Sequence, residues 1–193
     1  MKTLKYIREQ KNSNLLSLGF GGEESVVYTV NLAAYSDAGA PGVGDTLDED
    51  CLAILSECDE YIRATKKALN LLAFADNNRR NLSVKLARAG FGRDVCERVV
   101  RDMLDHGYID EKRQLERIIL VEANTKLRGP MKIIPALAAK GYSTADIREV
   151  MSALVESGEL DFKKNAKTLL DKKLPDADGE EKKKFLYKNG YKV

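Results

Sequence analysis

The pattern Leu-x-x-x-Gly-aromatic occurs three times along the chain, and this recurrence constrains the fold more than any other feature. The copies begin at Leu86, Leu137 and Leu186, so they lie 51 and 49 residues apart. In each copy the glycine suits the left-handed position after a helix end, where the following aromatic residue would contact the leucine as in a Schellman cap. A period near 50 residues with apolar positions in register indicates tandem helical units.

The stretch around the middle copy reads as two helices joined by a tight stop. Gly129-Pro130 blocks a helix from upstream, and proline suits the first turn of the next helix because its missing N–H is not needed there. Gly141 is expected to end that helix. Ser143 is expected to cap the next helix, with Asp146 three residues later as a short form of the capping box.

The N-terminal 31 residues have the pattern of strands rather than helices. Turn signals at Asn12–Asn14 and Gly21-Gly22 separate short β-type runs, which predicts a three-stranded antiparallel meander. The runs cover residues 4–8, 15–20 and 26–30.

The segment after the predicted meander leads into the helical part of the chain. Residues 33–44 are rich in Gly, Ala and Pro and are expected to form a loop. Thr46 and Glu49 make a capping box, which predicts a helix from Leu47. Apolar residues continue to about Ala75, either as one bent helix or as two. Asn78 is then expected to cap the next helix.

The sequence therefore predicts a mainly α fold with a small N-terminal antiparallel β extension. Tandem three-helix repeats, helix-turn-helix-like, are expected to form a curved elongated array. The expected parts are 1–45 for the β extension and loop, 46–111 for a linking helix and repeat 1, 112–158 for repeat 2, and 159–193 for repeat 3. The third repeat lacks its last helix in this sequence.

Composition and motifs argue against an enzyme. The 193 residues are 44% hydrophobic and 32% charged, as in ordinary globular domains. No apolar run reaches the ~20 residues that span a bilayer, and the N-terminus has no signal-peptide core, so a cytoplasmic location without a membrane partner is expected. The three cysteines lack metal-site spacing and are expected to be reduced. His106, the single histidine, has no catalytic partner motif, so we expect no catalytic residue, metal or cofactor.

Charge is distributed unevenly along the chain. Residues 1–63 hold 5 Lys and Arg against 11 Asp and Glu, a net charge of −6, whereas residues 64–193 hold 27 against 19, a net charge of +8. The helical part is thus basic, which suggests an anionic partner. An ordinary solvated surface accounts equally well for such a surplus, so both interpretations stay open.

Clustered basic residues are the candidates for contacting such a partner. They flank the predicted helices of all three repeats, and Lys85 and Arg88 share one helix face because they are three residues apart. The candidate partner-binding residues are Arg79, Arg80, Lys85, Arg88, Arg93, Lys126, Arg128, Lys132, Lys140 and Lys188.

The chain resembles the RecX family of bacterial recombinase regulators over residues 64–191. The resemblance lies in Gly107-Tyr108-Ile109-Asp110, in Gly129-Pro130 followed by Lys132-Ile133, and in the repeated Leu-x-x-x-Gly-aromatic stops. The chain departs from the family at Asp76-Asn77-Asn78, where a basic-x-basic-Ser sequence is usual, and at Glu111, where a second Asp is common.

The resemblance implies three tandem three-helix units that bind in the groove of the RecA–single-stranded DNA filament. It implies a non-enzymatic, monomeric regulator that restrains RecA activity in homologous recombination, DNA repair and the SOS response, with direct contact to single- or double-stranded DNA left open. Two alternatives remain on the residues alone. One is an autonomous helix-turn-helix nucleic-acid-binding protein, because the units have short turns and basic flanks. The other is a helical scaffold for another protein.

Overall fold

The computed structural model describes residues 1–11, 13–21 and 25–192. The chain divides into two compact units. The first contains Met1–Phe74 and Ser83–Asp105, and the second contains Ala75–Leu82 and His106–Val193. Helix α3 (Arg79–Arg88) contributes residues to both units.

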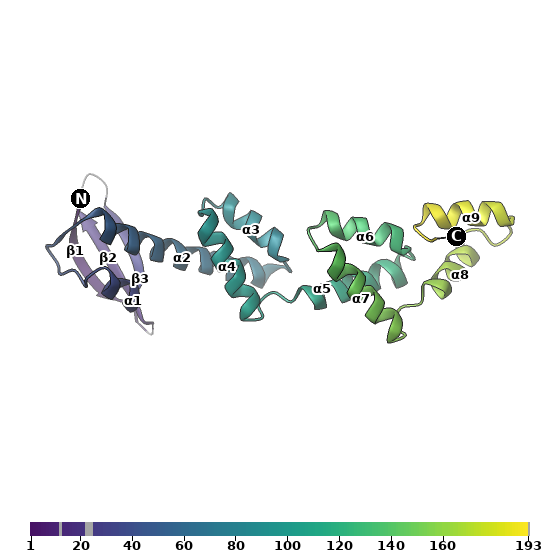
Figure 1. Cartoon of the computed structure of the whole chain (residues 1–193), viewed down its shortest axis with the longest axis horizontal. Coiled ribbons are helices and arrows are strands. Elements are labelled where there is room, and N and C mark those ends of the chain that lie inside the picture. Colours follow the sequence, from purple (N-terminus) through teal and green to yellow (C-terminus); the bar gives the residue numbers. More distant parts are fainter. Residues whose placement is uncertain (12, 22–24, 193) are drawn as a thin grey trace. The chain divides into compact units, whose positions relative to one another are not determined.

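The first unit begins with an antiparallel sheet of strand order β3-β2-β1-β4 (Figure 1). Strands β1 (Lys2–Glu9), β2 (Leu15–Gly21) and β3 (Val26–Asn31) form the meander that the sequence predicts. One sheet face is apolar and is buried against helices α1 and α2. The predicted turn residues Asn12 and Gly22 lie outside the described residues.

Two predictions for the segment after the meander are wrong. Part of the expected loop is a short helix, α1 (Leu32–Asp37), because the Asn31 side chain accepts the Ala34 N–H at 2.8 Å and caps it. Thr46 is not a helix cap. It belongs to β4 (Thr46–Leu47), which pairs with β1 and buries Leu47 in the sheet core.

Helix α2 (Glu49–Phe74) is one continuous helix, capped by Asp48, whose side chain accepts the Cys51 N–H at 2.8 Å. Its buried Asp59 joins the helix to the sheet, because the carboxylate accepts the Thr29 N–H at 2.8 Å and the Arg63 guanidinium at 2.7 Å. At the edge of β3, where no further strand pairs, the Asp59 carboxylate therefore accepts a backbone N–H that would otherwise lack a partner.

Helix α4 (Arg93–Asp105) packs along α2. Its apolar stripe is buried, and burial raises the pKa of the Cys96 thiol in that stripe. The Tyr61 hydroxyl donates to Asp102 at 2.6 Å, and the Arg98 guanidinium lies 4.3 Å from the centroid of the same tyrosine ring. The stripe consists of Val95, Cys96, Val99, Val100 and Met103.

The second unit consists of helices that alternate with tight stops (Figure 1). Asp110, Ser143, Asp161 and Asp178 cap the helices that follow them, each accepting a backbone N–H. The helices are α5 (Glu111–Leu120), α6 (Pro130–Ala139), α7 (Thr144–Glu156), α8 (Phe162–Lys173) and α9 (Gly179–Lys188), with a π-helical turn η1 (Val121–Thr125) directly after α5.

The three predicted helix stops have the same geometry. The stop glycines Gly90, Gly141 and Gly190 have φ of +92°, +98° and +89°. In each case the N–H of the following aromatic residue donates to the carbonyl of the leucine, at 3.4, 3.3 and 3.0 Å in chain order. The predicted Schellman caps are confirmed in all three copies.

Consecutive repeats of the second unit meet at two equivalent joints. In the first joint, the Asn78 side-chain amide donates to the Lys140 carbonyl at 2.9 Å, directly before the Gly141 stop. In the second joint, the Gly129 N–H donates to the Asn189 carbonyl at 2.9 Å, directly before the Gly190 stop. Gly129 lies 51 residues after Asn78 and so occupies the equivalent position in the next repeat. In both joints, the residue before a helix (α3 or α6) therefore binds the helix stop of the following repeat.

Buried amide side chains add a second contact to each joint. Gln114 donates to the Asn77 carbonyl at 3.3 Å, and Asn165, its equivalent 51 residues later, donates to the Ala123 carbonyl at 3.1 Å. The stop tyrosines contribute as well, since Tyr142 donates to Gln114 at 2.9 Å and Tyr191 donates to the Leu127 carbonyl at 3.1 Å. A buried amide must satisfy its donors, so these bonds fix the register between repeats.

The π-helical turn after α5 has no counterpart in the sequence prediction. It is followed by Leu127 at φ +52°, an uncommon backbone conformation for a leucine. The Leu127 side chain is buried with Leu169 and Tyr191. Packing of the third repeat therefore holds this segment in place. In the part of the chain that the structure describes, no helix is long and apolar enough to cross a bilayer.

Candidate partner-binding surface

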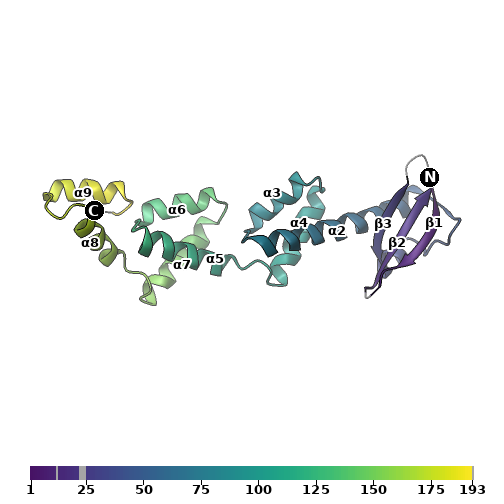
Figure 2. The same ribbon diagram turned by 180° about the vertical axis from the view of Figure 1, so that it is seen from behind.

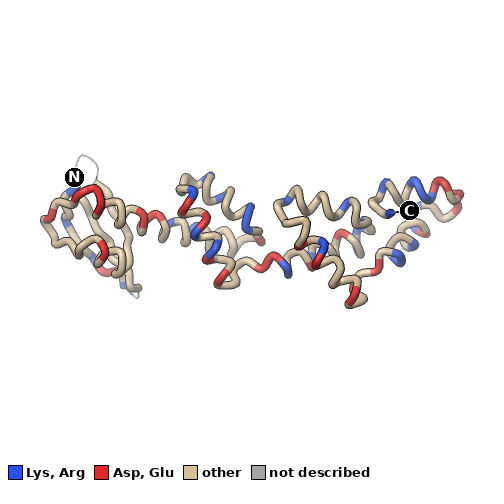
Figure 3. Tube along the Cα trace, in the orientation of Figure 1, with Lys and Arg blue, Asp and Glu red and all other residues tan. Residues whose placement is uncertain are grey.

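The predicted basic residues are divided between the two units. Lys85, Arg88 and Arg93 belong to the first unit and the others to the second. All of them are exposed, and Arg128 also pairs with a buried carboxylate. Figure 3 shows Lys and Arg in blue along the helices, and the basic residues of α8 and α9 are all lysines.

Arg79 is engaged with carboxylates inside the second unit. Its backbone N–H and its Nε each donate to Glu111 at 2.7 Å, and its guanidinium lies 3.8 Å from Asp146. Hydrogen bonding to Glu111 raises the pKa of Arg79. Glu111 is buried, so the pair ties the start of α3 to the start of α5. The charge of Arg79 is largely neutralised where it lies.

Lys126 and Arg128 share one buried partner. Their side chains donate to opposite oxygens of Glu122 at 2.6 Å each. The hydrogen bond from Lys126, followed by the charge of Arg128, holds the pKa of the Glu122 carboxyl below its usual range. These two cations therefore stabilise the π-helical turn between repeats.

Glu122→Gln is expected to lower the free energy of unfolding by about 1–3 kcal/mol at neutral pH, because two cations lose a buried acceptor. The folded-state pKa of Glu122 lies below its unfolded value, so its stabilisation is present above the unfolded value and is lost as the pH falls through the folded value. Urea unfolding at neutral and acidic pH measures this. The difference between variant and parent should shrink at acidic pH. Glu97→Gln, which removes an exposed pair with Arg93, is the matched control and should change little.

The remaining basic residues of the second unit lie at the two joints. The Arg80 stem covers Gly141, and Lys140 supplies the carbonyl that Asn78 binds. At the second joint, the backbone of Lys132 contacts Gly190, and Lys188 lies two residues before that glycine. Each joint is thus flanked by an exposed pair of cations, Arg80 with Lys140 and Lys132 with Lys188.

A polar hollow beside α5 was not anticipated from the sequence. Arg113 and Arg117 face it from one side of α5, and Arg117 forms an ion pair with Asp76 at its rim. Tyr108, which is 56% exposed, lies in the loop before α5 and also borders it. The i,i+4 spacing of the two arginines after Gly107-Tyr108 was the signal that could have identified this feature.

The single histidine lies directly after α4. His106 is exposed and its ring lies 6.5 Å from that of Tyr108. Within the described ranges, no cluster of three or more His, Cys, Asp or Glu side chains is arranged to hold a metal ion.

Comparison with known proteins finds relatives along most of the chain. No protein-family model matches it. It is 28% identical to a Regulatory protein RecX of Clostridioides difficile over 165 residues, which cover 86% of this chain and 72% of the relative. A RecX of Clostridium tetani is 25% identical over 83% of this chain and 72% of its own length. The chain is thus similar to RecX proteins over most of its length.

Solved RecX structures have the same fold. A crystal structure of regulatory protein RecX matches with a TM-score of 0.72 at 18% identity, covering all of this chain and 95% of that one. RecX from Lactobacillus salivarius matches with a TM-score of 0.61 at 20% identity, over 70% of this chain and 90% of that one. The mainly α fold with a small N-terminal antiparallel sheet is therefore confirmed.

The residues that carry the RecX resemblance form the framework of the second unit. Gly107 has φ +72°, Asp110 caps α5, and Gly129 forms the second joint. Both departures from the RecX pattern also lie at the first joint, since Asn78 caps α3 and binds Lys140 while Glu111 holds Arg79. The RecX motifs in this chain thus specify how repeats connect.

Proposed function

We propose that the chain is a non-enzymatic regulator that binds the RecA–single-stranded DNA filament and restrains recombinase activity. The observation that carries the proposal is the similarity to proteins named Regulatory protein RecX, over 86% and 83% of this chain. Two equivalent joints support it, because repeats connected in a constant way can follow a partner that itself repeats.

The basic residues at the joints give the proposed surface its chemistry. Arg80, Lys132, Lys140 and Lys188 are exposed, and none of them forms an ion pair with a carboxylate of the described residues. Arg79, Lys126 and Arg128 already bind buried carboxylates. Their proposed role is to stabilise the segments that carry this surface. An acidic groove or exposed phosphates are the complementary partner.

RecA assays test the proposed function. Substoichiometric protein should reduce RecA ATP hydrolysis and strand exchange on single-stranded DNA. Unchanged rates at every ratio would overturn the proposal. Tight, steeply salt-dependent binding to naked DNA without an effect on RecA would favour an autonomous nucleic-acid-binding protein.

Reversing Lys85, Arg88 and Arg93 to Glu tests the first-unit cations. The triple variant changes the local charge by six units and leaves the buried apolar residues of α3 and α4 unchanged. Folding should survive, because surface charges contribute ~0–1 kcal/mol each to stability. Inhibition of RecA should weaken, and its dependence on salt should flatten, if these residues face an anionic groove. Strand exchange across a salt series is the measurement.

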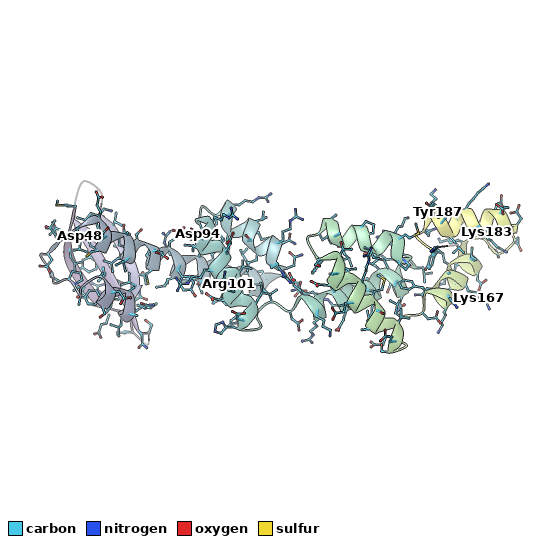
Figure 4. All side chains as sticks on the ribbon, in the orientation of Figure 1. Asp48, Asp94, Arg101, Lys167, Lys183 and Tyr187 are labelled. Atoms are coloured by element: carbon cyan, nitrogen blue, oxygen red, sulfur yellow. The ribbon has the colours of Figure 1, made fainter. Side chains whose placement is uncertain are left out.

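The matched control is the equivalent reversal of Lys182, Lys183 and Lys184 in α9. Lys183 lies on the exposed side of that helix, near Tyr187 (Figure 4). A smaller loss is expected there, because Glu180 and Glu181 in the first turn of α9 already offset part of the charge of these lysines. A folded first-unit variant that inhibits as strongly as the parent would remove Lys85, Arg88 and Arg93 from the proposed surface.

A further inference from the structure

The sheet of the first unit has one face that its helices leave uncovered. The buried side chains Leu16, Leu18 and Phe20 point to α1 and α2. Figure 2 shows the opposite face, with the strands in front of the helices. On that face β2 presents Leu15, Ser17, Gly19 and Gly21, and β3 presents Val27, Thr29 and Asn31, none of which is charged. The charged side chains of β1 therefore determine the electrostatic character of the face.

A β-bulge brings two neighbouring residues of β1 to this face. Pairing of β1 with β2 shifts between Leu4 and Tyr6, so Lys5 and Tyr6 do not alternate as they would in a regular strand. The Lys5 stem lies across Gly21, and the Tyr6 ring lies across Gly19. A Cβ on either glycine would overlap these side chains, so both glycines make room for the pair.

The Tyr6 ring is held flat with one side against Gly19 and remains 41% exposed. The Arg8 guanidinium lies 5.9 Å from the ring centroid. Covering a glycine with an aromatic ring stabilises a sheet by itself. That role does not account for the bulge that turns Lys5 to the same side, nor for the second cation beside the ring.

The charge of this face differs from that of the N-terminal part as a whole. Lys5, Arg8 and Lys11 are exposed along β1 and at its end, with Glu9 as the one acidic residue of the strand. The acidic residues of this part lie mainly on α1, α2 and the segment between them, such as Asp37, Asp48–Asp50, Glu57, Asp59 and Glu60. The net charge of −6 therefore conceals a basic sheet face.

We propose that this face binds single-stranded nucleic acid, with a base stacked on Tyr6 and the backbone phosphates paired with Lys5 and Arg8. A flat exposed ring between two cations fits a nucleotide, since stacking and phosphate pairing act on neighbouring groups of the same ligand. An acidic peptide would use the cations and leave the ring unused. The face lies outside the candidate surface on the helices, so it adds a second contact to the proposed regulator.

Fluorescence anisotropy with the full chain tests the proposal, using a short labelled oligothymidylate and an abasic chain of equal length. The parent should bind the oligothymidylate more tightly. Tyr6→Leu, which keeps an apolar cover on Gly19, should weaken oligothymidylate binding by about tenfold and leave abasic binding unchanged. Tyr6→Phe should retain the preference, because it keeps the ring. Lys5→Gln with Arg8→Gln should reduce the salt dependence of binding by about two phosphate contacts.

Matched controls come from the same unit. Phe74→Leu removes a ring that is 92% exposed, and Lys67→Gln removes an exposed lysine of α2, so neither should alter the preference. Photocrosslinking of an iodouridine-containing oligonucleotide should map to β1, which gives a readout even if Tyr6→Leu folds poorly. Equal binding of the abasic chain, equal competition by polyglutamate, or crosslinks confined to the second unit would each overturn the proposal.

Discussion

Gly129→Ala is expected to detach the third repeat from the second unit. A Cβ at this position would lie 2.6 Å from the Tyr191 nitrogen and closer still to the carbonyl group of Gly190. These are backbone atoms, which cannot swing aside as a flexible side chain can. The Gly129 N–H also donates to Asn189 and the Met131 N–H to Gly190, so separating the backbones breaks both bonds of the joint. We expect a loss of about 1–3 kcal/mol or more in the stability of that contact.

Hydrogen exchange resolves this loss along the chain. Amide protection in α8 and α9 should fall in Gly129→Ala, whereas α2 and α4 of the first unit should keep theirs. Gly179→Ala is the matched control, because a Cβ there meets nothing within 4 Å. Its protection should equal that of the parent. Unchanged protection of α9 in Gly129→Ala would mean that the second joint does not hold the third repeat.

Features that depend on a few neighbouring residues were predictable from the sequence. The three Leu-x-x-x-Gly-aromatic stops, the caps at Asn78 and Ser143 and the antiparallel meander all appear as expected. The reason is that a cap or a turn satisfies its hydrogen bonds within one turn of chain. The β4 strand was missed because its partner, β1, lies more than 40 residues away in the sequence.

The candidate surface was predictable only as a list of cations. Sequence spacing places Arg79, Lys126 and Arg128 beside helices but gives no information about buried acceptors. Glu111 lies 32 residues from Arg79, and only the fold brings the two together. Glu122 looks like an ordinary helix-surface residue in the sequence, yet the π-helical turn buries it against Lys126 and Arg128. Whether a basic side chain is paired with a carboxylate thus depends on the tertiary fold and cannot be inferred from sequence spacing.

The joints explain why the departures from the RecX pattern are compatible with the fold. Asn78 stands where a serine is usual, and its side-chain oxygen caps α3 as a serine would. Its amide nitrogen also donates across the joint to Lys140, a bond that at the second joint is made by the Gly129 backbone. Asparagine therefore serves both contacts with one side chain.

Gly141→Val is expected to destabilise the second unit more than Gly90→Val destabilises the first. Both glycines have positive φ, where an L-residue costs about 1–2 kcal/mol and a β-branched one is strained further. They differ in surroundings. A Cβ at Gly90 meets nothing within 4 Å, whereas one at Gly141 would lie 2.8 to 3.3 Å from the Arg80 stem. The first joint is therefore disturbed only by the substitution at Gly141.

Urea unfolding of both variants, followed by hydrogen exchange, separates backbone strain from joint disruption. Gly90→Val should lose stability through its cap alone and keep the protection of the Asn78–Lys140 contact region. Gly141→Val should lose the same amount and, in addition, protection at the start of α3. Arg80→Ala in the Gly141→Val background should restore part of the difference, because it removes the stem that the valine meets. Unfolding of both single variants within error of the parent would show that the repeated stops do not determine the stability of the repeats.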